Sequence, residues 1–148
     1  MCRGTKPNLS GMIDVDGQCH CGAVKIRASV DPDSVTLCHC PDCQEFTGSP
    51  YRAAVPADAE RFEIVSGTPA RYIKTREDGS RRVHAFCSSC GSPMFSSADE
   101  PSPKVYRLRL GTLRQRAGLK PVRQQWCSTA FPWALIPGIP SVEESFAP

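Results

Sequence analysis

The sequence predicts a mainly β protein with few and short helical turns, and three observations support this fold class. First, 14 Pro and 11 Gly among 148 residues favour short strands joined by turns over long helices. Second, several short segments alternate apolar and polar residues, the pattern of a strand with one buried face. Third, most of the nine cysteines fall into three tight clusters, which favours sheets held together by metal. The length suits one domain with its own core.

The elements are predicted in chain order from local patterns. Residues 24–30 alternate and predict a half-buried strand, and residues 31–34 predict a turn. Pro41 suits the first position of a short helical turn, and the Asp78-Gly79 pair predicts a hairpin. We expect residues 113–118 to form a loop or a short helix. Further strands are expected at 51–55 (closed by Pro56), 62–64, 70–75, 83–86, 93–97, 106–110 and 123–127.

We expect a single domain over residues 16–136, with a flexible segment at 1–15 and an irregular tail at 137–148. The net charge of +3 is mild and Lys and Arg are spread along the chain, so no nucleic-acid partner is expected. Residues 1–10 contain no apolar signal-peptide core, and no run approaches 18 apolar residues. These features predict a cytoplasmic protein without membrane contact, and they leave its oligomeric state open.

In a reducing compartment, closely spaced cysteines indicate metal binding rather than disulfides. Disulfides are the alternative. A bridge between Cys19 and Cys21, however, would close a small and strained ring. The three clusters contain seven cysteines, which matches one four-coordinate structural zinc and one zinc with three protein ligands and an open position. We therefore expect two zinc ions per chain.

The first and last clusters predict the structural site. Gly22 follows the first and Gly91 follows the last, and a glycine there lets backbone N–H groups approach the sulfur atoms. The alternative is that these cysteines are merely buried. The predicted structural zinc ligands are Cys19, Cys21, Cys87 and Cys90.

The middle cluster predicts the second site, with Cys38, Cys40 and Cys43 as ligands. Its fourth position can be empty, or held by water, a substrate sulfur or a distant protein group. His39 lies inside the motif but points away from it in an extended C-x-C, which favours a supporting role. Cys127 follows a predicted strand and can close the site. If it does, this zinc is structural rather than catalytic.

An open, sulfur-bound zinc can bind an added thiol, lower its pKa and present a thiolate that adds to a carbonyl. Residues close to the cluster in sequence can move protons or hold carboxylates, or they can be ordinary surface or supporting residues. These candidates are His39, Asp42, Tyr51 and Arg52.

Three ordered motifs resemble the glutathione-dependent formaldehyde-activating enzyme family. Residues 17–24 match its G-x-C-x-C-G-x-V, residues 38–49 its C-H-C-x-x-C…[ST]-G-[SA], and residues 86–94 its F-C-x-x-C-G-[ST]-x-[LM]. Residues 111–113, Trp126 and the Pro132-Trp133 pair also fit family positions. The resemblance covers about residues 16–136.

The resemblance implies a β-tent fold of antiparallel sheets meeting around zinc. It implies a structural zinc on the first and last clusters and a catalytic zinc on the middle one. It also implies the condensation of formaldehyde with glutathione, formally the activity of a carbon–sulfur lyase. The partners would be a small thiol such as glutathione and a small aldehyde.

One position departs from the family pattern. Many members carry basic residues directly after the third central cysteine, where this chain has Gln44 and Glu45. A carboxylate there would repel a thiol that bears carboxylates. A related chromosomal protein of animals carries the same domain, so the alternative function is a zinc-stabilised binding module without catalysis, in which both metals are structural.

Overall fold

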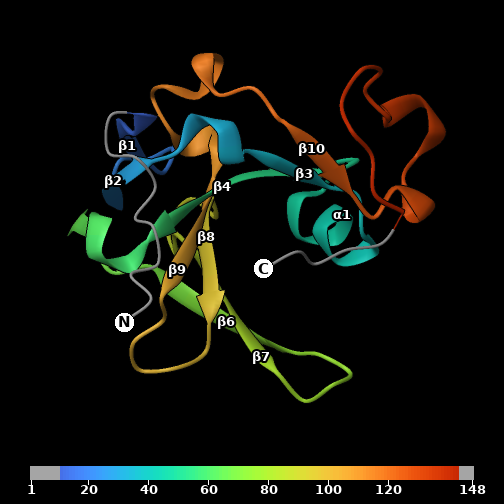
Figure 1. Ribbon diagram of the computed structural model, residues 1–148. Helices are drawn as coiled ribbons and strands as arrows, with labels where there is room; N and C mark the ends of the chain where they lie inside the picture. Colours follow the sequence, from blue (N-terminus) through green and yellow to red (C-terminus); the bar gives the residue numbers. More distant parts are fainter. Residues whose placement is uncertain (1–10, 144–148) are drawn as a thin grey trace, which may run out of the picture.

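The computed structural model describes residues 11–143, and the fold is mainly β (Figure 1). Within this range ten strands form two sheets, accompanied by one α-helix and short 3₁₀ turns. No helix in this part of the chain is both long enough and apolar enough to cross a membrane. Most of the segment expected to be flexible, residues 1–10, lies outside the described residues, as do residues 144–148 of the tail.

The smaller sheet has three antiparallel strands in the order β1-β2-β5. They are β1 (Ile13–Gln18), β2 (Lys25–Val30) and β5 (Phe62–Ser66). The predicted strand at 24–30 is confirmed, and its apolar residues are the buried ones. β1 begins at Ile13, inside the segment expected to be flexible, because it pairs with β2 along its whole length. The ordered domain therefore starts earlier than residue 16.

The larger sheet has seven strands in the order β10-β3-β4-β9-β8-β7-β6. Adjacent strands in this sheet are antiparallel, except that β10 and β3 are parallel. β6 and β7 form the predicted hairpin, with Gly79 in its turn at φ 85°. The strands are β3 (Thr36–Cys38), β4 (Arg52–Asp58), β6 (Ala70–Thr75), β7 (Arg81–Phe86), β8 (Pro93–Ala98), β9 (Val105–Arg109) and β10 (Arg123–Gln125).

Several predicted strand ends differ from the structure, among them the ends of β4 and β10. β4 continues through Pro56, which pairs with Arg107 of β9 and lies past Ala54, the last residue of β4 that pairs with β3. β10 ends at Gln125 rather than at residue 127, because Trp126 adopts a left-handed conformation with φ 57°. Residues 113–118 form loop and a short 3₁₀ turn at Arg116–Gly118.

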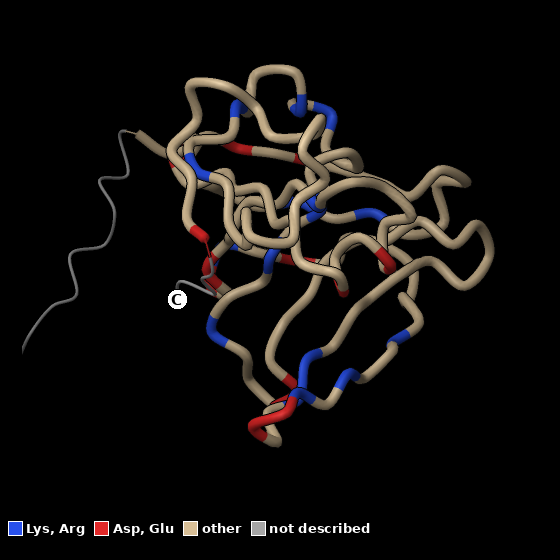
Figure 2. Tube along the Cα trace, turned by 90° about the vertical axis from the view of Figure 1, so that its right-hand side faces the viewer, with Lys and Arg blue, Asp and Glu red and all other residues tan. Residues whose placement is uncertain are grey.

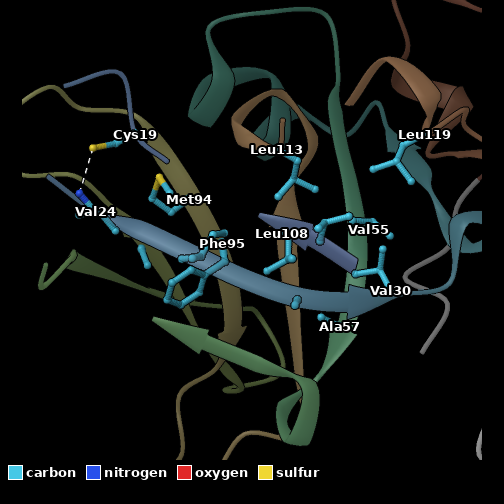
Figure 3. Close-up of a cluster of buried hydrophobic side chains, with 14 of the residues drawn as sticks. Cys19, Val24, Val30, Val55, Ala57, Met94, Phe95, Leu108, Leu113 and Leu119 are labelled. Carbon is cyan, nitrogen blue, oxygen red and sulfur yellow. Dashed lines mark hydrogen bonds between the residues drawn. The ribbon is translucent and has the colours of Figure 1, made fainter. Parts of the chain in front are cut away.

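The main core lies between the two sheets (Figure 3). Apolar side chains of β2, such as Val30, meet Val55 of β4 and Leu108 of β9. Phe62 stacks on Tyr106 with ring centroids 4.3 Å apart, and this pair continues the core toward β5. Burial of these side chains supplies most of the favourable free energy of folding.

The other face of the larger sheet supports the single helix, α1 (Pro41–Thr47). Directly paired residues share a face, and pairing places Arg107, Ser96, His84 and Tyr72 in one row across β9, β8, β7 and β6. α1 packs on this row through Phe46, whose ring stacks on that of His84. The sheet therefore has an apolar face toward the core and a polar face beneath α1.

The described part of the tail has no strand or helix of its own, but hydrogen bonds anchor it to β10. The N–H of Gln124 donates to the carbonyl of Pro140, and the N–H of Val142 donates to the carbonyl of Gln124, both at 2.9 Å. Further along, the N–H of Cys127 donates to the carbonyl of Val142 at 3.0 Å. Residues 137–143 therefore pack as part of the domain.

Candidate metal centres and the adjoining cavity

The first and last cysteine motifs come together as one four-cysteine cluster. Cys19 and Cys21 lie in the turn after β1, and Cys87 and Cys90 lie in the turn between β7 and β8. Their four sulfur atoms all lie within 4.8 Å of one another. Sγ of Cys21 is 3.6 Å from that of Cys19 and 3.7 Å from that of Cys87. The cluster therefore links the turn after β1 of the smaller sheet to the turn between β7 and β8 of the larger sheet.

The two turns that form this cluster have matching geometry. Cys19 donates its N–H to the carbonyl of Val24, and Cys87 donates its N–H to the carbonyl of Ser92, both at 3.0 Å. Gly22 and Gly91 both have positive φ, at 81° and 77°, a conformation that glycine adopts without strain. The N–H of Val24 donates to Sγ of Cys19 at 3.2 Å, so backbone donors do approach the sulfur, as the glycine positions predict.

The middle motif forms a separate three-cysteine cluster. Cys38 ends β3, Cys40 caps the N-terminus of α1, and Cys43 lies in the first turn of that helix. All three are buried, and their sulfur atoms lie within 4.8 Å of one another. Pro41 starts the helix, and Cys40 accepts the N–H of Cys43 at 3.4 Å. The capping geometry therefore turns the three thiols toward one point.

Neither candidate for a fourth protein ligand joins the three-cysteine cluster within residues 11–143. Sγ of Cys127 contacts the carbonyl of Gln124 at 3.6 Å instead. His39 is fully buried, and its Nε2 lies 3.1 Å from Oε1 of Gln124. Its carbonyl accepts a hydrogen bond from Thr129 at 3.1 Å. His39 therefore ties the cluster loop to β10 and the segment after it.

Both clusters have the donor set and spacing of a thiolate metal site. For a tetrahedral zinc with Zn–S bonds of about 2.3 Å, neighbouring sulfur atoms are roughly 3.8 Å apart. The separations of 3.6 and 3.7 Å in the four-cysteine cluster agree with that geometry. These cysteines are free thiols rather than disulfides. The two groups can hold metal ions, and zinc fits their chemistry.

The three-cysteine cluster opens into a cavity of about 250 Å³, which we call the cationic cavity. Cys40 and Cys43 form part of its wall. The only carboxylate lining it among the described residues is that of Asp42, which pairs with Lys74. The cationic lining residues are Arg52, Lys74, Arg76, Arg82 and Arg107. Positive charge therefore exceeds negative charge beside the thiols.

These cations come from segments that are distant in sequence. Figure 2 shows Lys and Arg spread along the whole trace rather than gathered in one run. Strand pairing in the larger sheet brings these residues together. Lys74 pairs with Arg82, and Arg52 pairs with Cys38. Of the charged residues that line this cavity, only Asp42 and Arg52 were predicted from the sequence. A signal for the cavity was the alternation of Arg107 and Arg109 with apolar residues in β9, where the basic side chains share one face.

Burial and mutual repulsion shift the pKa values of the basic groups around this cavity. Burial, followed by the charges of Arg107, Arg76 and Arg52, lowers the pKa of Arg82 to about 10. The pKa of Arg109, which is 7% exposed, falls well below its ordinary value, first through burial and then through repulsion by Arg52. The shifts indicate excess positive charge that an anionic ligand would offset.

His84 experiences the same field. Burial, and then the charges of Arg109 and Arg52, lower the pKa of His84 to about 3. Its Nδ1 lies 3.4 Å from Nη2 of Arg109. The ring is therefore neutral near pH 7 and contributes an aromatic surface rather than another charge.

The remaining candidates divide between the cavity and its support. Asp42 and Arg52 line the cavity, whereas Tyr51 packs edge-on against His39 with centroids 5.3 Å apart. The amide of Gln44 donates to the carbonyl of His39 at 2.8 Å. Glu45 is exposed and does not line the cavity. The departure from the family pattern after Cys43 therefore places no carboxylate in the cationic cavity.

The two sheets and the two cysteine clusters define a mainly β protein with two groups of cysteines that could hold metal ions. A family model described as glutathione-dependent formaldehyde-activating enzyme matches residues 14–129. The chain belongs to this family, as its three ordered motifs indicate. The family takes its description from the glutathione-dependent activation of formaldehyde.

Two curated relatives support the assignment. A Halomonas elongata protein, provisionally named as a glutathione-dependent formaldehyde-activating enzyme, is 29% identical over 85 residues, or 55% of this chain and 54% of the relative. An uncharacterized lyase of Schizosaccharomyces pombe is 24% identical over 88 residues, or 57% and 58%. The matches thus span little more than half the length of these relatives.

A solved structure supports the fold alone. The crystal structure of a Rhodobacter sphaeroides protein aligns with a TM-score of 0.53 and 23% identity, over 67% of this chain and 87% of that one.

Proposed function

We propose that this protein is a zinc-dependent enzyme that forms and breaks the carbon–sulfur bond between an anionic thiol, such as glutathione, and a small aldehyde. The observation that supports this proposal most strongly is the opening of the three-cysteine cluster into the cationic cavity. Three buried thiolates leave one position of a tetrahedral metal available, and the neighbouring cations suit the carboxylates of the thiol.

A zinc ion held by Cys38, Cys40 and Cys43 would supply a Lewis acid that keeps a bound thiol ionised near neutral pH. In the overall reaction the sulfur–carbon bond forms, the carbonyl π-bond breaks, and the thiol proton ends on the new hydroxyl. No oxidation or reduction occurs.

The residues of the chain itself would bind and orient the thiol. Arg52, Arg82 and Arg107 surround the cavity and can hold carboxylates through paired hydrogen bonds. Fixing the thiol beside the aldehyde lowers the entropic part of the barrier. The low pKa of His84 keeps its ring uncharged near neutral pH, so this side chain adds no further cation to the cavity. We assign the four-cysteine cluster a structural zinc, because it links two sheets and lies outside this cavity.

The test measures adduct formation in zinc-reconstituted protein. NMR exchange spectroscopy with glutathione and formaldehyde should show faster formation of the hydroxymethyl adduct than the background reaction, and metal analysis should give two zinc ions per chain. Cys40→Ser should abolish the excess rate. Cys127→Ser is the matched control and should retain it, because this thiol lies outside the cluster.

The proposal fails if zinc-replete protein binds no thiol and gives no excess rate. The binding module with two structural metals is then the better description. Equal loss in Cys40→Ser and Cys127→Ser would instead make Cys127 a fourth ligand, which closes the site.

A further inference from the structure

A second cavity, of about 320 Å³, adjoins the cationic cavity and has a different chemistry. We call it the apolar cavity, because its lining is mainly apolar. The ring of Phe46 from α1 forms one wall, and Tyr72, Phe86 and Pro93 come from three neighbouring strands. A cavity of about 150 Å³ is enough for a benzene ring. The apolar cavity therefore has room for an aromatic ring or an alkyl chain of similar size.

One buried polar group of this cavity lacks a partner. Arg109 lines the cavity and is 7% exposed. Its Nη1 is buried and makes no hydrogen bond within the described residues. An unsatisfied buried donor costs about 1–3 kcal/mol, so such a group calls for an acceptor. A ligand that offers one oxygen beside an apolar body would satisfy it.

The two cavities meet at a shared wall. Phe46 and His84 line both of them, and their rings stack with centroids 4.0 Å apart. The charges of Cys43 and Cys38 also act on the pKa of Arg109, in the direction that raises it. The cationic cavity suits the anionic part of a substrate, and the apolar cavity suits an uncharged part.

We propose that the apolar cavity binds the organic group of the aldehyde, so that the substrate class includes aromatic and medium-chain aldehydes and not formaldehyde alone. This inference rests on the proposed function and deepens it. The carbonyl oxygen accepts from Nη1 of Arg109, while the ring or chain packs against Phe46 and Tyr72. The chemistry balances as for formaldehyde: thiol and aldehyde combine into a hemithioacetal, and the thiol proton ends on its hydroxyl.

The first experiment measures binding without catalysis. Benzyl alcohol has the size and single oxygen of the proposed ligand but cannot react with a thiol. Saturation-transfer NMR on zinc-replete protein should show saturable binding of benzyl alcohol. Tyr72→Ala should weaken it at least fivefold, because it removes one wall at a residue that is 56% exposed and not part of the core. Phe131→Ala removes an exposed aromatic ring that does not line this cavity, and it should change nothing.

The second experiment compares benzaldehyde and formaldehyde as substrates with the same thiol. Tyr72→Ala should lower the ratio of their kcat/KM values at least fivefold, whereas Phe131→Ala should leave the ratio unchanged. Arg109→Met should also weaken benzyl alcohol binding. If that buried substitution prevents folding, the Tyr72 variant still decides the matter.

The outcomes separate the two proposals. Reaction with formaldehyde but no binding of benzyl alcohol overturns the apolar site and leaves the proposed function standing. Saturable binding that Tyr72→Ala weakens, without reaction of either aldehyde, supports the apolar site and overturns the proposed function. Equal binding by the Tyr72 and Phe131 variants overturns the apolar site.

Discussion

The ring of Phe46 stacks on that of His84, with centroids 4.0 Å apart and 17° between the ring planes. This contact joins the helix that carries Cys43 to the polar face of the larger sheet. It also places a neutral aromatic surface among several cations, since the pKa of His84 is lowered to about 3. A protonated ring at this position would add to the repulsion that already acts on Arg109 and Arg82.

His84 should therefore affect stability in acid. Between its folded pKa of about 3 and the ordinary value of 6.5, the unfolded chain binds a proton that the folded chain does not. The free energy of unfolding should thus fall as pH drops through this window, with no contribution above it. Denaturant titrations at pH 7, 6 and 5 should show a smaller fall in the free energy of unfolding for His84→Gln than for the wild type. Some fall should remain in the variant, because protonation of the thiolates affects both proteins. An NMR titration of the His84 ring with a midpoint near 6.5 would contradict the prediction.

Arg107 should contribute to binding rather than to stability. Its pKa is lowered by burial and then by the charge of Arg52, so its removal relieves repulsion. Arg107→Met should raise KM for glutathione about 10-fold or more, as expected for a lost hydrogen bond to a charged group worth about 1.5–3 kcal/mol. Its melting temperature should be unchanged or higher. Arg27→Met is the matched control, because Arg27 pairs with Glu63 away from the cavity. An equal KM in the two variants would refute the role of Arg107.

The two cysteine clusters could be predicted from sequence because their geometry is mostly local. Cys38, Cys40 and Cys43 converge through one strand end and one helix cap, both within six residues. The four-cysteine cluster needs one long-range contact, but each half carries its own turn and glycine. The alternation of apolar and polar residues likewise predicted β2, because successive residues of a strand point to opposite faces of the sheet.

The cavities could not be predicted in the same way. Arg52, Arg82 and Arg107 lie on three strands, and which of their neighbours they meet depends on strand order and register. The pairing rules that fix register act between segments, so composition along the chain shows only dispersed charge. Trp126 illustrates a second limit: its positive φ ends β10, and local sequence does not indicate a left-handed tryptophan.

Two glycines allow a test of how tightly the four-cysteine cluster is supported. Gly67 and Gly79 have nearly equal positive φ, at 80° and 85°. A Cβ on Gly79 meets nothing within 4 Å, whereas one on Gly67 would lie 2.1 Å from the carbonyl oxygen of Ala23, in the turn that holds Cys21. Gly79→Ala should cost about 1–2 kcal/mol from backbone strain. Gly67→Ala should cost clearly more in urea titrations and should release zinc more readily. An equal loss of unfolding free energy in the two variants would mean that the turn at Ala23 can move away from the added Cβ at little cost.

Replacing Cys87 should impair folding, whereas replacing Cys40 should mainly impair function. Cys87 and Cys21 are 66 residues apart, so their shared site closes a long loop between two sheets. Structural zinc contributes on the order of 10 kcal/mol, comparable to the whole stability of a domain. Cys40 closes only a short loop, which hydrogen bonds from His39 to Gln125 and from Gln44 to Thr129 also hold. Thermal melts of zinc-replete protein should show a large drop for Cys87→Ser and a small one for Cys40→Ser, which should nevertheless have lost one zinc and all excess rate. Equal drops in melting temperature would mean that both metals are structural. The catalytic role proposed for the three-cysteine cluster would then be wrong.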